Sequence, residues 1–178
     1  MADPAINHPL TPKRRWFLKT VLAIGALGAG LGGLVYWSRG ISEGQLTEAG
    51  KDVFHGLSRG FLGPMLPADA AERERALSLH LARLETFLNG LPPALQLQVN
   101  ALLGLLGNRP TRYLLTGVNG TWRDASDEQI GEAMERMRLH DLGSHRLTYQ
   151  VMRSITCMAF FTQTDNWTQT GYPGPMNI

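Results

Sequence analysis

Residues 69–88, DAAERERALSLHLARLETFL, carry the clearest helical pattern of the chain. Leucines recur at a spacing that places them on one face of an α-helix: Leu77, Leu81, Leu84 and Leu88. Charged residues between them are expected to face solvent: Glu72, Arg73, Glu74, Arg75, Arg83 and Glu85. Asp69 precedes the run and is a favourable N-cap residue. The stretch therefore predicts an amphipathic helix that ends at about Leu88 and packs one face on a core.

The segments on either side of this stretch also predict helices. A helix is expected from Thr47, a suitable N-cap, to about Phe61, although Gly56 and Gly60 are unfavourable in a helix interior. Residues 94–106 are apolar around most of the helical circumference, which predicts a helix buried on several sides. The central part of the chain is thus expected to be helical.

Further helices are expected beyond a break at Arg109-Pro110. A short helical piece is expected over residues 113–117, and Ser126 with Gln129 fits a capping box for a helix to about residue 140. Four methionines in the second half of the chain lie at core-like spacing: Met134, Met137, Met152 and Met158.

No alternating pattern of the kind that indicates strands or hairpins is present, so the fold class expected is all-α. A last helix is expected over residues 144–161. We predict a single helical domain of five or six helices over residues 47–161, after an N-terminal signal or anchor helix within residues 1–38 and a linker over 39–46. Residues 162–178 are polar and contain proline and glycine, which predicts an irregular C-terminal arm.

The N-terminus has the pattern of an export signal. Residues 12–19, PKRRWFLK, are followed at once by an apolar, glycine-rich run over residues 20–37. A paired arginine, an aromatic residue, Leu-Lys and a mildly apolar segment in this order resemble a twin-arginine signal. Such signals direct folded proteins to the twin-arginine translocase, which predicts a periplasmic location. The residues that carry the signal are Arg14, Arg15, Phe17, Leu18 and Lys19.

The same N-terminal segment fits an anchor in the inner membrane. The apolar run is close to the shortest length that spans a bilayer, and its basic flank suits the cytoplasmic side. No small-x-small cleavage site is evident, because Tyr36-Trp37-Ser38-Arg39 ends the run. A cleaved signal, an uncleaved signal anchor and a plain single-span anchor are therefore all open.

The distribution of charge argues against nucleic-acid binding. The chain has 178 residues and a formal net charge of +2 at pH 7. Its first 40 residues carry +4, which leaves −2 for the remainder. The basic surplus belongs to the predicted signal, and no basic face is expected on the domain.

Cys157 is the only cysteine, which excludes an internal disulfide, a Cys-x-x-Cys metal site and a Cys-x-x-Cys-His haem attachment. Its apolar neighbours favour burial, but an intermolecular disulfide is open in an oxidising compartment. Histidines on the expected helices are interpreted as structural or surface residues rather than ligands: His55, His80, His140 and His145. We expect no metal, cofactor or catalytic residues in this chain.

The C-terminal arm carries two large aromatic residues, Trp167 and Tyr172, in a segment with little regular structure. Aromatic side chains with a polar end are typical anchors of protein interfaces. Two interpretations are open: the arm folds back over its own helices with Trp167 as a lid, or it contacts a partner.

The two ends of the chain resemble the small subunits of periplasmic flavoprotein dehydrogenases, the gluconate 2-dehydrogenase subunit 3 family. The resemblance includes the twin-arginine start, the size, the helical middle and the motif Trp…Gly-Tyr-Pro-Gly-Pro near the end. It implies a large partner subunit of the glucose–methanol–choline type, which holds FAD and oxidises sugars, sugar acids or alcohols. It also implies that the small subunit supplies the export signal, assists maturation of the partner and stays bound to it.

The resemblance and the aromatic pattern together give a set of residues expected to bind the partner: Phe160, Phe161, Trp167, Gly171, Tyr172, Pro173, Gly174 and Pro175. A cytochrome subunit is a further partner left open by this reading. An independent, signal-anchored periplasmic protein that contacts a quinone or haem is the alternative. A self-standing enzyme is disfavoured, because the motifs supply no set of nucleophile, base and stabilising groups.

Overall fold

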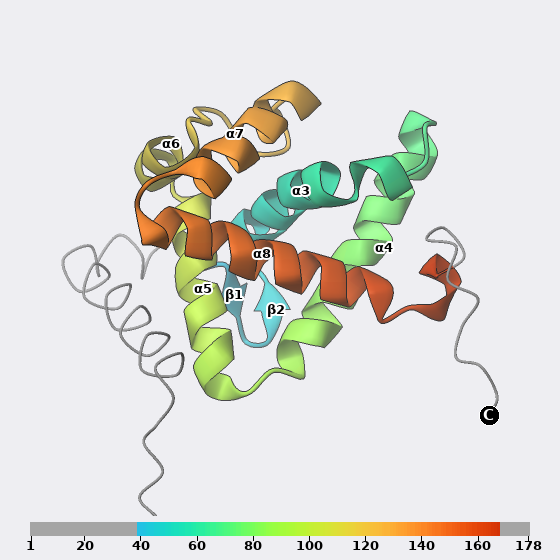
Figure 1. Cartoon of the computed structure of the whole chain (residues 1–178). Helices are drawn as coiled ribbons and strands as arrows, with labels where there is room; N and C mark the ends of the chain where they lie inside the picture. Colours follow the sequence, from blue (N-terminus) through green and yellow to red (C-terminus); the bar gives the residue numbers. More distant parts are fainter. Residues whose placement is uncertain (1–38, 168–178) are drawn as a thin grey trace, which may run out of the picture. The chain divides into compact units, whose positions relative to one another are not determined.

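Figure 1 displays the computed structural model, which describes residues 39–167. Its α-helices are α3 (Glu48–Leu62), α4 (Ala70–Asn89), α5 (Pro93–Gly107), α6 (Arg109–Thr116), α7 (Asp127–Leu139) and α8 (Gly143–Phe161). Two short strands, β1 (Ile41–Ser42) and β2 (Gln45–Leu46), form an antiparallel hairpin. Single 3-10 turns follow α3 and α8: η1 (Gly63–Met65) and η2 (Thr164–Asn166). The described part of the chain is mostly helical, which confirms the expected class at this level.

Two predicted segments lie outside the described residues: the signal or anchor over 1–38, and the arm beyond Trp167. Within residues 39–167, no helix combines the length and the apolar character that crossing a bilayer requires.

The helix starts expected from the sequence are confirmed at three caps. The Thr47 hydroxyl accepts a hydrogen bond from the Gly50 amide at 3.2 Å and begins α3. The Asp69 carboxylate accepts from two amides in the first turn of α4, at 2.9 and 3.0 Å. Ser126 and Gln129 form the reciprocal capping box of α7. Each cap satisfies amides that have no partner within their own helix.

The predicted linker over residues 39–46 is partly a hairpin, which corrects the expectation that no hairpin is present. Its strands are two residues long, too short for an alternating pattern to be visible in the sequence. Glu43 and Gly44 both have positive φ angles, 51° and 78°, as in the primed turns that close tight hairpins.

Helix α6 starts four residues earlier than expected, at Arg109 rather than Tyr113. Pro110 lies in its first turn, where the missing N–H has no intrahelical partner to lose. Pro110 is therefore part of the first turn of α6 and does not separate two structural elements. Gly117 ends α6 with a φ of 82°, a left-handed conformation that suits glycine.

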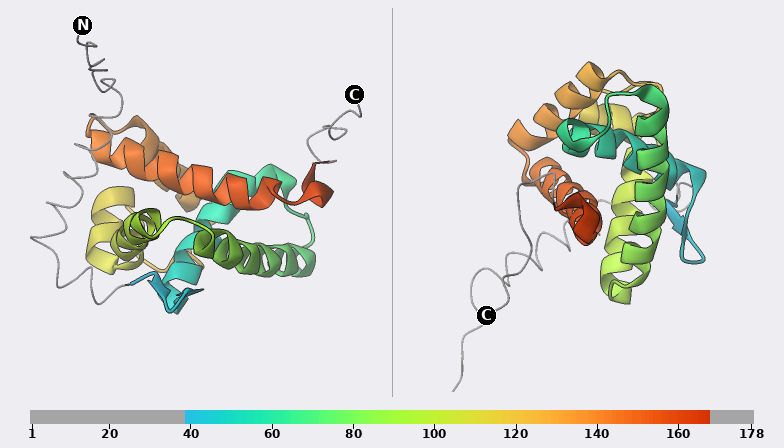
Figure 2. Two further views of the ribbon diagram at one scale, coloured as in Figure 1. Left: turned by 90° about the horizontal axis from the view of Figure 1, so that it is seen from below. Right: turned by 90° about the vertical axis from the view of Figure 1, so that its right-hand side faces the viewer.

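Helix α3 is the centre of the helical body. It packs against α4, α5, α7 and α8, and Figures 1 and 2 show it crossed by α8. Residues 53–58 are buried without interruption, so every side of the helix is covered there. A helix enclosed in this way orients the elements that pack on it.

Trp122, in the loop between α6 and α7, is fully buried against α3. Its indole N–H donates to the Leu106 carbonyl of α5 at 2.9 Å. The Asp52 carboxylate of α3 accepts hydrogen bonds from the amides of Trp122 and Arg123, at 3.0 and 2.9 Å. Gly56 faces the ring, and a Cβ there would come within 2.7 Å of the Trp122 Cβ. The glycine that weakens α3 in isolation is thus the one that admits the tryptophan.

Two expectations about burial need correction. The inner side of α5 is buried as expected, but Leu97 is 73 % exposed, because α5 packs mainly on α3 and α6 and leaves Leu97 open to solvent. Met134, Met137 and Met152 lie in the core, whereas Met158 is 48 % exposed. Helical spacing identified these residues as apolar but could not say how many sides of each helix would be covered.

Gly56→Ala is expected to destabilise the protein, because its methyl group would overlap the buried Trp122 side chain. Overpacking of this kind costs about 1–3 kcal/mol. The free energy of unfolding, measured by urea titration, is the readout.

Gly131→Ala is the matched control, since Gly131 lies inside α7 with nothing within 4 Å of an added Cβ. Removing a helical glycine there should stabilise the protein by about 0.5–1 kcal/mol. The same sign of change in both variants would contradict the packing of Trp122 on Gly56.

Candidate functional site

The end of α8 contains the described residues among those predicted to bind a partner. Phe160 is 6 % exposed, and its ring packs edge to face against His80 of α4, with centroids 5.8 Å apart. Phe161 is half-buried and packs edge to face against Phe160 at 5.2 Å. Phe160 therefore belongs to the packing between α8 and α4, and Phe161 offers the more accessible surface.

Side chains of the following turn cap the C-terminus of α8. The buried Asn166 amide donates to the Phe160 carbonyl at 2.7 Å, and the Trp167 indole N–H donates to the Phe161 carbonyl at 2.7 Å. The turn η2 brings both donors back over the helix end, with the Trp167 amide bonded to the Thr164 carbonyl at 3.0 Å. These bonds supply short side-chain partners to carbonyls of the last helical turn, where the Phe160 carbonyl otherwise has the Gln163 amide at 3.4 Å.

Trp167 thus caps the last turn of its own helix, and whether the arm covers the helices or contacts a partner stays open. Its side chain is half-buried, so part of the indole also remains accessible. Contact with a partner stays a prediction for Trp167, as it does for Phe161. Gly171, Tyr172, Pro173, Gly174 and Pro175 lie outside the described residues, as do the export residues from Arg14 to Lys19.

Cys157 is a free, half-buried thiol on α8. Burial raises its pKa, while nearby Arg153 acts in the opposite direction. A raised pKa keeps the sulfur protonated and less nucleophilic at neutral pH. Its participation in an intermolecular disulfide remains a prediction.

His80 is almost completely buried, at 1 % exposure. Neither ring nitrogen has a hydrogen-bond partner among residues 39–167. Burial lowers the pKa of His80 to about 4, with a smaller contribution from the positive charge of Arg83. The ring is therefore neutral in the folded protein at neutral pH.

His140 and His145 stack on each other at the junction of α7 and α8, with ring centroids 3.8 Å apart. Burial lowers the pKa of His145, and His140 contributes to the same shift. In the part of the chain that the structure describes, no group of three or more His, Cys, Asp or Glu side chains could hold a metal ion.

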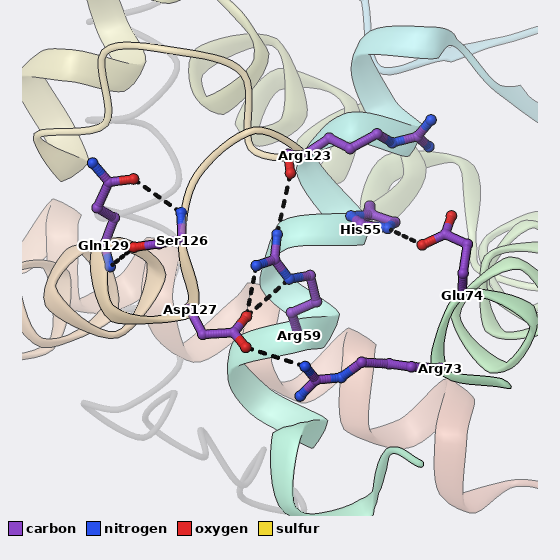
Figure 3. Close-up of polar contacts among 8 residues, drawn as sticks. All are labelled: His55, Arg59, Arg73, Glu74, Arg123, Ser126, Asp127 and Gln129. Carbon is purple, nitrogen blue, oxygen red and sulfur yellow. Dashed lines mark hydrogen bonds and ion pairs between the residues drawn. The ribbon is translucent and has the colours of Figure 1, made fainter. Parts of the chain in front are cut away.

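A polar network joins α3, α4 and the start of α7 (Figure 3). Asp127 of α7 accepts hydrogen bonds from Arg59 at 2.6 and 2.9 Å and from Arg73 at 3.1 Å. Arg59 also donates to the Arg123 carbonyl at 3.2 Å. Burial alone would raise the pKa of Asp127, but the two guanidinium groups lower it below its usual value. The carboxylate thereby bridges α3 and α4 at the beginning of α7.

His55 and Glu74 form the second pair in this region, with His55 Nε2 and Glu74 Oε2 3.0 Å apart (Figure 3). The hydrogen bond from His55 lowers the pKa of Glu74. A histidine beside a carboxylate can serve as a general base, but only where a substrate can reach it. The His55 side chain is 5 % exposed, so this pair packs α3 against α4.

A cleft of about 360 Å³ lies between the end of α6, the following loop and α7. Its charged lining residues are Asp124, Glu132 and Arg136. Arg136 lies against Gly117, where an added Cβ would come within 3.1 Å of the guanidinium carbon. Neither His55 nor Glu74 lines the cleft, so the structure does not combine this space with the acid–base pair.

Comparisons of the chain with models of known protein families, with curated proteins and with solved structures gave no match.

Two groups that organise the described structure were not identified from the sequence. Asp52 lies on α3 among other charged residues, and nothing in the local pattern indicates that it binds the amides of Trp122 and Arg123, some 70 residues away. Asn166 lies five residues beyond the end of α8, too far for the usual rules of helix ends to identify it as a cap.

Asn166→Ala is expected to lower the free energy of unfolding by about 1–2 kcal/mol, because it removes a buried donor and leaves the Phe160 carbonyl with only the longer bond from the Gln163 amide, at 3.4 Å. Trp167→Phe keeps a ring but removes the N–H donor, and should cost about 0.5–1.5 kcal/mol. Both variants should speed amide hydrogen exchange in the last turn of α8. Thr164→Ala, an exposed position in the same turn, is the control; exchange as slow in Asn166→Ala as in this control would rule out the cap.

Stability is expected to fall with acidification below pH 6.5 because of His80. In the unfolded chain His80 binds a proton with its ordinary pKa of 6.5, whereas in the folded protein its pKa is about 4. Unfolding therefore takes up a proton between these values, and stability present at neutral pH is lost as the pH falls. Urea titrations at pH 7.5 and 5.0 should differ by about 2 kcal/mol on account of His80.

His80→Leu should remove most of this pH dependence, and the smaller contribution of His145 should remain. The lowered carboxyl pKa values of Glu74 and Asp127 affect stability only at more acidic pH, as those carboxylates become protonated. An unchanged difference between pH 7.5 and 5.0 in His80→Leu would show that the ring is not buried in its neutral form.

Proposed function

We propose that this chain is a non-catalytic small subunit that escorts a folded flavin-dependent dehydrogenase across the inner membrane and stays bound to it. The observation that carries the proposal is the ordered pattern of Arg14-Arg15, Phe17-Leu18-Lys19 and the apolar run over residues 20–37. The pattern that begins at Trp167 and ends at Pro175 supports the kind of partner, by its resemblance to small subunits of such enzymes.

The physical role of the signal follows from the pathway that it resembles. A translocase that accepts folded proteins allows FAD to be inserted into the large subunit in the cytoplasm. A single signal on this chain then serves both subunits, provided that they associate before export. The chemistry, the flavin and the oxidised sugar, sugar acid or alcohol all belong to the partner in this proposal.

The end of α8 is a suitable place from which to engage that partner. Capping by Asn166 and Trp167 fixes the point at which the arm leaves the helical body. An arm that starts from a fixed point loses less conformational freedom on binding than one attached through a flexible joint. Phe161, Trp167, Tyr172 and Pro173 are the anchors proposed, together with the exposed Met158, three residues before Phe161 on α8.

The cellular location of the complex is part of the same proposal. The complex is expected in the periplasm, held at the inner membrane if residues 20–37 are not removed. A cytochrome subunit that receives electrons from the flavin is compatible with this arrangement.

Changing Arg14 and Arg15 together to Lys should keep this chain and its flavin partner in the cytoplasm, because twin-arginine signals require the guanidinium pair although lysine has the same charge. Cell fractionation with flavin fluorescence of the large subunit is the measurement. Lys13→Arg, which leaves the pair intact, is the control. Normal export of the flavin subunit in the double variant would contradict escort by this chain.

Native affinity purification of the wild-type chain tests the partner itself. A stoichiometric large subunit with a flavin absorbance spectrum is expected. A chain that purifies alone and colourless would overturn the escort function.

A further inference from the structure

Helices α5 and α6 present large apolar side chains to the outside. Leu97 of α5 is 73 % exposed and Leu114 of α6 is 76 % exposed, the two highest values among the large hydrophobic residues described. Tyr113, next to Leu114, is 59 % exposed. Side chains of this size and exposure on two adjoining helices suit a surface that something else covers.

Helix α6 buries polar side chains and exposes apolar ones, whereas a helix on a water-facing surface does the opposite. Its polar residues Thr111, Arg112 and Thr116 are buried. Arg112 donates to the Gly107 carbonyl at 3.0 Å, and the Thr116 hydroxyl donates to the Arg112 carbonyl at 2.8 Å. These polar side chains thus find hydrogen bonds inside the protein, apart from Arg112 Nε, which has no partner among residues 39–167. Tyr113 and Leu114 are exposed instead, the opposite of the usual pattern.

The sequence around this surface lacks negative charge. Residues 86–123, which include all of α5 and α6, contain no acidic residue and no lysine. Their charged residues are Arg109, Arg112 and Arg123. Arg112 is buried and Arg123 lies in the loop before α7, so Arg109 is the exposed charge that α5 and α6 offer to anionic lipid headgroups.

The chain enters the described domain directly on α5. The Ile41 amide donates to the Asn100 side chain at 2.9 Å, and Asn100 donates back to the Ile41 carbonyl at 3.2 Å. Gly40 packs so closely on Leu103 that an added Cβ would overlap its side chain. Asn100 lies three residues after Leu97, and residues at this spacing are neighbours on a helix surface.

This entry point fixes how far α5 can lie from the apolar run. The run ends at Trp37, four residues before Ile41. Four residues of fully extended chain reach at most about 14 Å. If residues 20–37 stay in the bilayer, α5 is therefore held at the membrane surface.

We propose that the outer face of α5 and α6, with Leu97, Tyr113 and Leu114, rests on the lipid surface of the membrane beside the anchor. The proposal relies on the anchored form of the proposed function, in which residues 20–37 are retained. Leucine enters the acyl region, tyrosine sits at the headgroup level, and Arg109 lies near anionic phosphates. Figures 1 and 2 show α6 near the start of α8 and η2 at the opposite end of that helix, so this face leaves the end of α8 to the flavin subunit.

The test uses the full chain in bilayers of phosphatidylethanolamine and phosphatidylglycerol, with a fluorescent label on single cysteines in a Cys157→Ser background. Leu97→Cys and Leu114→Cys place the label on the proposed face. Ser154→Cys is the control, because Ser154 is exposed on α8, which packs on α3, α4 and α7. Lipids with spin-labelled acyl chains should quench the labels at positions 97 and 114 and leave the label at position 154 bright.

Each result decides the proposal. Equal brightness at all three positions, in a chain that resists carbonate extraction, overturns membrane contact but keeps the anchor. Extraction by carbonate overturns the anchor and the membrane contact together, while flavin-subunit pull-down still tests the escort function separately. If the labels at positions 97 and 114 become buried only after the flavin subunit is added, this face contacts the protein partner. That result overturns the lipid assignment.

Discussion

The packing of Trp122 on α3 is the contact on which the arrangement of the helices depends. Asp52 holds the backbone at Trp122 and Arg123, Gly56 makes room for the ring, and the indole N–H reaches Leu106 on α5. One side chain thereby fixes the loop before α7 against both α3 and α5. Because α3 also packs on α4 and α8, this contact joins the loop to the helix that touches most of the others.

Where α3, α4 and α8 pack together, hydrogen bonding of buried polar atoms is less complete than around Trp122. Buried polar atoms of Ser58, His80 and Thr156, one residue from each helix, have no hydrogen-bond partner among residues 39–167. A buried polar atom without a partner costs about 1–3 kcal/mol. Apolar neighbours such as Leu57, Leu84 and Ile155 offset this cost. The polar network of Arg59, Arg73 and Asp127 adds a further connection between the last turn of α3 and the first turns of α4 and α7.

The proposed function distributes three tasks over separate parts of the chain. Export is assigned to the N-terminal pattern, partner binding to the end of α8 with the arm, and membrane contact to α5 and α6. The helical body is the element that keeps these parts apart. The caps at Asn166 and Trp167 and the bonds between Ile41 and Asn100 fix the two points where the terminal segments join it.

Much of the described fold was predictable because its signals are local. The caps at Thr47, Asp69 and Ser126 involve residues within three positions of each other, and the leucines of α4 follow the helical period. The start of α6 and the hairpin before α3 were missed. Pro110 was interpreted as a break although it suits a first helical turn, and strands of two residues leave no period to detect.

The candidate site was predictable only in part for the same reason. The sequence identified Phe160, Phe161 and Trp167 as large aromatic residues near a helix end, but their exposure depends on which neighbours reach them. Phe160 is covered by α4, whereas Phe161 and Trp167 are half-buried. The inverted surface of α6 was hidden as well, because short helical spacing does not reveal which side packs on α5.

The sequence by itself determined the helical class, the helix caps and the order of apolar and charged segments, since these depend on residues close together in the chain. The tertiary structure alone decided that Gly56 admits Trp122, that Asp52 binds a loop some 70 residues away, and that Leu97 and Leu114 face outward. Contacts between distant residues and the number of covered sides on a helix arise from tertiary packing, which the local sequence pattern does not determine.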